Sequence, residues 1–215
     1  MSTSTRSDPT PRRAPARRGH GAALRDEILA AASTLIAHSG DVATLTLRAV
    51  AREVGVAATS IYLHFSSIEE LLTAVKAHRF QELADALTAA AADVGDDDPV
   101  ARLRARAHAY VRFGAEHPGE YAVMFAARFA PADGAVPTRP MITVDLFEAI
   151  AADLGTVRRQ GRPPMDEAEA TMVTFHLWTS LHGMVSLRML RPHMGWPSVA
   201  AEVDDLVHRL VGPTD

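Results

Sequence analysis

Apolar residues recur at intervals of three and four along most of this chain, the spacing that places them on one face of an α-helix. Besides a pair of short elements near residue 55, the pattern predicts helices over these approximate ranges: 22–39, 67–94, 99–116, 118–129, 141–157, 166–190 and 198–211. The connecting segments are rich in proline and glycine. No run alternates apolar and polar residues as a half-buried strand does. We therefore predict an all-α fold.

Residues 46–65 are predicted to form two short helices joined by a tight turn. Thr46 is a residue type that caps helix N-termini, and Gly55 stands where the first helix needs a residue that tolerates positive φ. Ile61 and Phe65, four residues apart, continue the apolar stripe into the second helix. The rest of that helix presents small, hydroxylated and aromatic side chains, which suit the major groove of DNA. The segment is a helix-turn-helix candidate.

Residues 23–82 resemble the DNA-binding domain of TetR-type transcriptional regulators. The matching features are the leading amphipathic helix, a Thr-Leu-Arg-x-Val-Ala-Arg-Glu-x-Gly-Val run, and Ser-Ile-Tyr-x-His-Phe before Ser-x-x-Glu-Glu-Leu. The resemblance implies that Thr46, Tyr62 and His64 contact phosphates. It also implies a wider DNA-binding set in which Thr59 and Ser60 lie nearest the base edges, with further members Arg48 and Leu63.

Two positions depart from the family pattern in ways that bear on phosphate anchoring. Ile68 stands where the family often has a lysine, and Ala57 replaces the serine that usually opens the second helix. We expect weaker anchoring as a result. An arginine-rich arm at residues 1–21, predicted to be disordered, could compensate by neutralising phosphates or entering the minor groove. The alternative is that this arm only improves solubility.

The charge of the chain is unevenly distributed. Its net charge is −4, but residues 1–80 carry 10 basic and 7 acidic residues, a net +3, while residues 81–215 carry 12 and 19, a net −7. A mildly basic front on an acidic body is typical of a DNA-binding module joined to one that does not bind DNA. We predict a DNA-binding domain at residues 22–82, joined by the long helix to a helical ligand-binding and dimerisation domain at residues 83–215.

The predicted helix at residues 166–190 carries apolar side chains on every side. Such a helix must be covered all round, and a body of this size can cover only one side, so a second subunit is expected to cover the other. The helix at 198–211 adds a further apolar stripe. We predict a homodimer, as in the TetR family, with these interface residues: Leu177, Leu181, Met184, Leu187, Val203, Leu206 and Leu210. The alternative is a central core helix in a monomer.

Aromatic and histidine side chains are dense between residues 108 and 182. The runs at 110–125 and 178–183 also resemble one subgroup of TetR-type C-terminal domains that has a Trp-His-Gly signature, which implies no ligand identity. Effector pockets combine apolar walls with a few polar groups. The candidate ligand residues with that mixture are Tyr110, Phe113, His117, Tyr121, Phe125, Phe175, Trp178 and His182. For each of them alone, plain core packing is the alternative.

The sequence offers little support for catalysis or metal binding. It has no nucleophile elbow, no His-Glu-x-x-His pair and no glycine-rich phosphate loop, so we predict no enzyme activity and no cofactor. The chain has no cysteine, and the acid–histidine pairs are too small for a tight metal site. Without an 18-residue apolar run or a signal peptide, a cytoplasmic location and no membrane contact are expected.

These observations together predict a homodimeric transcriptional repressor that binds a palindromic operator in double-stranded DNA. A small apolar or aromatic effector entering the body is expected to release it. One alternative is a DNA-binding dimer without an effector, controlled by a protein partner or by abundance. A more remote one is a helical metal-binding protein or enzyme.

Overall fold

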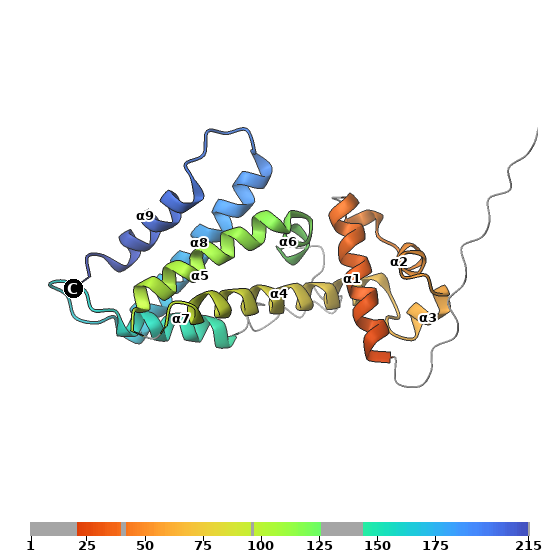
Figure 1. The fold of residues 1–215 in the computed structure, drawn as a ribbon, viewed down its shortest axis with the longest axis horizontal. Helices are drawn as coiled ribbons and strands as arrows, with labels where there is room; N and C mark the ends of the chain where they lie inside the picture. The colour runs from red at the N-terminus through yellow and green to blue at the C-terminus, as the bar shows by residue number, and fades with distance from the viewer. Residues whose placement is uncertain (1–20, 40–41, 96, 126–143, 215) are drawn as a thin grey trace, which may run out of the picture. The chain divides into compact units, whose positions relative to one another are not determined.

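The computed structural model describes residues 21–39, 42–95, 97–125 and 144–214 (Figure 1). Within these ranges the secondary structure is helical, with only two isolated β-bridges, Arg159 to Arg162 and Arg159 to Thr214. The elements in chain order are α1 (Gly21–Ser39), the 3-10 helix η1 (Val42–Thr44), α2 (Leu47–Val54), α3 (Ala58–Tyr62), α4 (Ile68–Ala92), α5 (Pro99–Glu116), α6 (Pro118–Phe125), α7 (Val144–Thr156), α8 (Glu167–Leu190) and α9 (Val199–Val211). The predicted all-α fold is confirmed.

The chain divides into two compact units, residues 1–75 and residues 76–215. The division falls inside helix α4, earlier than the boundary that we predicted after residue 82. The arginine-rich arm lies outside the described residues. So do the predicted end of the helix at 118–129 and the predicted start of the helix at 141–157.

The first unit packs α1, α2, α3 and the start of α4 around one apolar core. Ile28 and Ile36 of α1, Val50 of α2, Ile61 of α3 and Leu71 of α4 are all almost completely buried. These residues belong to the apolar stripes, at helical spacing, from which the helices were predicted. The sequence pattern therefore also predicts which side chains form this core.

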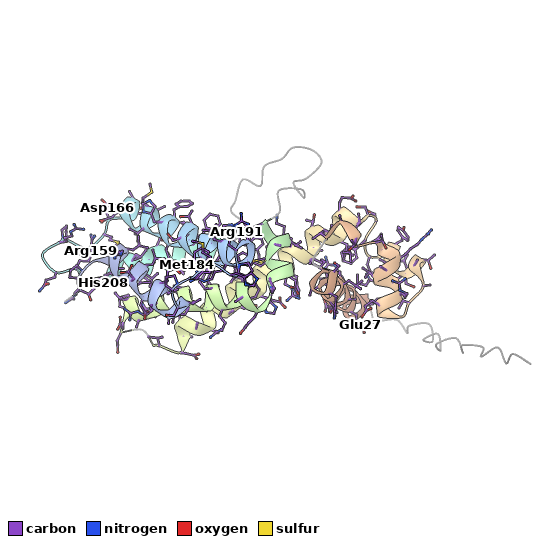
Figure 2. The ribbon with its side chains drawn as sticks, turned by 90° about the horizontal axis from the view of Figure 1, so that it is seen from above. Glu27, Arg159, Asp166, Met184, Arg191 and His208 are labelled. Atoms are coloured by element: carbon purple, nitrogen blue, oxygen red, sulfur yellow. The ribbon has the colours of Figure 1, made fainter. Side chains whose placement is uncertain are left out.

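The second unit is built around α5, which packs against α7, α8 and α9. Helix starts are well capped: the side chains of Asp98, Asp166 and Ser198 each accept a backbone N–H in the first turn of α5, α8 and α9. Figure 2 shows Asp166 and Arg191 at the two ends of α8, with Met184 between them. The core of this unit includes the buried side chains of Leu103, Tyr110, Tyr121 and Leu154.

No helix among the described residues combines the length and the apolar character that crossing a lipid bilayer would require.

Candidate nucleic-acid interface and aromatic cluster

The turn between α2 and α3 is held by caps at both ends of α2. The Thr46 hydroxyl accepts a hydrogen bond from the Ala49 N–H at 3.1 Å, so the predicted N-cap is present. Gly55 ends the helix with φ 77°, in the left-handed region that favours glycine, and the N–H of Val56 bonds to the carbonyl of Ala51 at 3.0 Å. The chain therefore reverses sharply at Gly55, which fixes where α3 begins.

Helix α3 is anchored by two apolar side chains and leaves the others outside. Ile61 and Phe65 are buried, and the guanidinium carbon of Arg25 lies 5.1 Å from the centre of the Phe65 ring. Ala57, at the N-cap, makes no side-chain cap bond, as the sequence predicted. The predicted DNA-binding residues then fall into two groups: exposed Thr46, Arg48, Thr59, Tyr62 and Leu63, and part-buried Ser60 and His64.

The exit from α3 is tied to the start of α4 by hydrogen bonds. The Glu70 carboxylate accepts the Ser66 N–H at 2.7 Å and the Ser66 hydroxyl at 2.6 Å, and the Ser67 hydroxyl accepts the Glu70 N–H at 3.2 Å. The two bonds from Ser66 lower the pKa of Glu70. These bonds fix the segment that follows α3 to the first turn of α4.

In the second unit, three of the predicted ligand residues form a hydrogen-bonded chain. The hydroxyls of Tyr110 and Tyr121 are 2.9 Å apart, and the Tyr121 hydroxyl lies 2.8 Å from Nδ1 of His182. Nε2 of His182 lies 3.3 Å from the Ser186 hydroxyl. Burial raises the pKa of Tyr110 to about 12, raises the pKa of Tyr121 further, and lowers the pKa of His182. All three groups are therefore neutral at pH 7.

Two more predicted ligand residues lie beside this hydrogen-bonded group of side chains. The Phe125 ring centre is 4.2 Å from that of His182 and 4.8 Å from that of Tyr121. Trp178 lines an apolar cavity of about 30 Å³ with Tyr110, between α5, α7 and α8. Its indole N–H is near the Tyr110 hydroxyl but, within the described part of the chain, is buried without a partner in hydrogen-bond geometry. Such a cavity has room for about one or two water molecules, far less than the several hundred Å³ typical of a ligand pocket.

The remaining three predicted ligand residues lie elsewhere. Phe113 packs on His117, with ring centres 4.8 Å apart, and both line an open groove of about 370 Å³ beside α4. Phe175 packs on Phe147 at 4.7 Å and lines an open groove of about 670 Å³ between α7 and α8. The structure thus brings together five of the eight candidates and separates the other three.

The residues predicted at a subunit interface are mostly inside the protomer. The side chains of Leu177, Leu181, Met184 and Val203 are buried in the unit's own core, which leaves them little surface for contact with a partner. Leu206 and Leu210 of α9 are part-buried. Only Leu187 is exposed. The apolar residues that α8 does expose are Met172, Phe175, Leu187, Met189 and Leu190.

Two family models match the chain. That for bacterial regulatory proteins of the tetR family matches residues 28–75, and that for the tetracyclin repressor-like C-terminal domain matches residues 103–212. The chain belongs to the TetR family. It is a DNA-binding transcriptional regulator by that membership, and the family is one of regulators rather than enzymes.

Individual relatives agree with this assignment. The chain is 28% identical over 176 residues to the HTH-type transcriptional regulator Rv1816 of Mycobacterium tuberculosis, covering 68% of this chain and 73% of the relative. A protein of unknown function from Rhodococcus sp. RHA1 has a similar structure, with TM-score 0.67 and 25% identity over 89% of this chain and 96% of that one. FadR from Bacillus subtilis, solved with stearoyl-CoA, shares the fold at TM-score 0.64 and 14% identity, over 88% and 99% of the chains.

The body of this TetR-family chain contains part-buried ion pairs that sequence reasoning missed. Arg106 of α5 pairs with Asp153 of α7, and Arg79 of α4 pairs with nearly buried Glu120 of α6 at 3.2 Å. The partners are 47 and 41 residues apart, so no local pattern could indicate them. Arg102 of α5 also pairs with Asp153, at 2.7 Å, so two arginines of α5 hold this carboxylate of α7.

The acid–histidine pairs considered for metal binding are His78 with Glu82 and Asp204 with His208. The first pair is in contact, at 3.3 Å, whereas Asp204 contacts His108 and Arg104, each at 3.2 Å. Within the described ranges no three His, Asp or Glu side chains gather as a metal site would need.

Proposed function

We propose that this TetR-family regulator is a homodimeric repressor whose two α3 helices read a palindromic operator, and that an apolar ligand in the body releases it. The observation that carries the proposal is the α2–α3 geometry: a capped first helix, a left-handed glycine turn, and a short helix held by two buried anchors. That geometry is the one by which helix-turn-helix proteins present a second helix to the major groove.

The proposed phosphate contacts are Thr46, Arg48, Tyr62 and His64, with Thr59 and Ser60 nearest the base edges. Their support is the surface exposure of Thr46, Arg48 and Tyr62 and the exposed position of Thr59, while His64 and Ser60 are part-buried. A hydroxyl that already caps α2, as that of Thr46 does, retains lone-pair capacity and a free O–H to donate to a phosphate.

The proposed dimer uses the outer face of α8 together with Leu206 and Leu210 of α9. Five large apolar side chains of α8 are exposed in the protomer, and soluble proteins seldom leave such a surface uncovered. Gly183 lies in the C-terminal half of α8, where a Cβ would meet nothing within 4 Å. We infer that the partner's helix approaches most closely there. A dimer would also place two α3 helices on successive major grooves.

The proposed effector site is the space bordered by Tyr110, Tyr121, Phe125, Trp178 and His182. Neutral polar groups set among apolar walls suit an apolar or aromatic ligand, and the stearoyl-CoA complex of FadR is a precedent from the same fold. Because the cavity beside Tyr110 and Trp178 is only about 30 Å³, ligand entry requires the helices to move apart. A ligand preferring that open geometry by about 2.7 kcal/mol would lower DNA affinity a hundredfold.

The small cavity also favours a second candidate, a DNA-binding dimer with no small-molecule effector. The two differ in one measurement. Apolar compounds from a chemically diverse panel should release operator DNA and raise Tm if an effector site exists. Failure of the whole panel, with operator binding intact, supports the second candidate.

DNA reading itself is tested by the salt dependence of operator affinity. Replacing Arg48 with Ala should weaken binding to every sequence and reduce the slope of log K against log salt by about two, one for each protomer. The matched control is Arg112→Ala, which removes an exposed arginine from the second unit and should leave the slope unchanged. Equal effects of the two variants, or binding without salt dependence, would refute the proposal.

A further inference from the structure

Helix α3 carries an apolar surface that the fold does not use. In the described part of the first unit, the exposed large hydrophobic residues are Tyr62, 54% exposed, and Leu63, 85% exposed. They are adjacent: Tyr62 is the last residue of α3 and Leu63 is its C-cap. Every other exposed large hydrophobic residue of the described chain belongs to the second unit.

The anchors of α3 determine where Leu63 points. Leu63 has a right-handed helical backbone, with φ −72° and ψ −19°. At 100° per residue, it lies about 200° around the helix from Ile61 and the same angle from Phe65. Since both anchors are buried, the Leu63 side chain projects directly away from the core.

The surroundings of Leu63 set it apart from a solitary surface leucine, which would need no explanation. It shares the outward surface with exposed Thr59 and part-buried Ser60, which can form hydrogen bonds to base edges. An aliphatic side chain there cannot form such bonds. Its contribution must come from an apolar group on the DNA.

We propose that Leu63 selects thymine, by packing on its C5 methyl, at one position of each operator half-site. In the major groove, the thymine methyl is the apolar group that distinguishes one base pair from the others. The inference rests on the proposed function, because it requires α3 to enter the major groove. Beyond that function, the inference names the base that Leu63 recognises.

The test uses the full-length protein and the strongest-binding duplex selected from a randomised library. Each thymine of that duplex is replaced in turn by deoxyuridine, which removes only the methyl group and keeps the hydrogen-bonding edge. Wild-type protein should lose affinity about fourfold at one thymine per half-site, the effect of one buried methyl, and about fifteenfold when both half-sites are replaced. Leu63→Ala should bind the thymine duplex as weakly as wild type binds the deoxyuridine duplex, and should not distinguish the two.

The matched control is Thr59→Ala, which alters the same surface but should keep the fourfold preference for thymine over deoxyuridine. Because Leu63 is almost fully exposed, Leu63→Ala should keep the wild-type Tm. Sequence-specific binding without any deoxyuridine effect, or an effect that persists in Leu63→Ala, overturns the inference and leaves the proposed function standing. If the library yields no preferred duplex, the proposed function and the inference both fail.

Discussion

The two long faces of helix α8 differ in what they meet. On the inward face, α8 contacts α5 so closely that a Cβ added at Gly114 would lie 2.5 Å from Cγ1 of Val185 and 3.2 Å from Cδ2 of Tyr121. On the outward face, a Cβ added at Gly183 would meet nothing within 4 Å. Both glycines lie inside helices, where glycine costs about 1 kcal/mol relative to alanine. The protomer's own packing explains the first glycine but not the second.

This difference indicates that the two apolar faces of α8 have separate roles. The inward face carries Leu177, Leu181 and Val185, which are already buried within one protomer. The outward face leaves Met172 and Leu190 largely exposed around a helix surface that has room for a close neighbour. The same apolar composition therefore serves core packing on one side and, in our proposal, dimerisation on the other.

The largest effect is expected from placing a carboxylate on each face in turn. Leu181 is 4% exposed and Leu190 is 69% exposed. Leu181→Glu buries an unpaired charge, which should cost more than about 4 kcal/mol and unfold the body. Leu190→Glu should keep the native circular dichroism spectrum and Tm of the protomer but give monomers in sedimentation. A folded, dimeric Leu181→Glu protein, or an unfolded Leu190→Glu protein, would reverse the assignment of the two faces.

A smaller effect is expected at the glycines. Gly114→Ala forces a methyl against Val185, which should cost about 1–3 kcal/mol, partly offset by the better helix propensity of alanine. We expect Tm to fall by roughly 3–6 °C at every protein concentration, with the monomer–dimer equilibrium unchanged. Gly183→Leu should instead affect the dimer and not the fold. It should raise the dimer dissociation constant at least about tenfold while the isolated protomer stays folded. A dimer that tolerates Gly183→Leu would place the close approach elsewhere.

The helix-turn-helix could be predicted residue by residue because its determinants are local. Thr46, Gly55, Ile61 and Phe65 act through caps, a left-handed turn and a spacing of four, each visible within twenty residues of sequence. Short-range rules were enough to predict the two helices and the turn that carry the candidate DNA-binding residues, five of which are exposed.

The body could be predicted only as a set of helices, because its site depends on contacts distant in sequence. Helix periodicity cannot orient α8 when every face is apolar, so Leu181 was assigned to an interface although the protomer buries it. Similarly, aromatic density indicated a cluster but not its membership. Tyr121 and His182 meet across 61 residues, whereas Phe175 faces the groove beside α7. Tertiary packing determines both the orientation of α8 and the membership of the aromatic cluster.

The smallest effect concerns His182, which lies where the buried side of α8 gives way to the open side. Burial lowers the pKa of His182 from its ordinary 6.5, so the unfolded chain binds more protons than the folded one as pH falls below 6.5. Stability from this group is therefore present above pH 6.5 and is lost on acidification. The cause is the burial of the ring; in addition, Nδ1 lies 2.8 Å from the Tyr121 hydroxyl, and a protonated ring could only donate at that nitrogen.

The groups that face His182 do not titrate in this range, since Tyr110 and Tyr121 have raised pKa values and Ser186 is a hydroxyl. Comparing wild type with His182→Gln therefore separates the contribution of His182 to the pH dependence of stability from that of the other nine histidines. Chemical unfolding at pH 7.5 and 5.5 should show wild type losing more stability than His182→Gln. Equal losses would mean that the imidazole is as well solvated in the folded protein as in the unfolded chain, and that the inner side of α8 ends before His182.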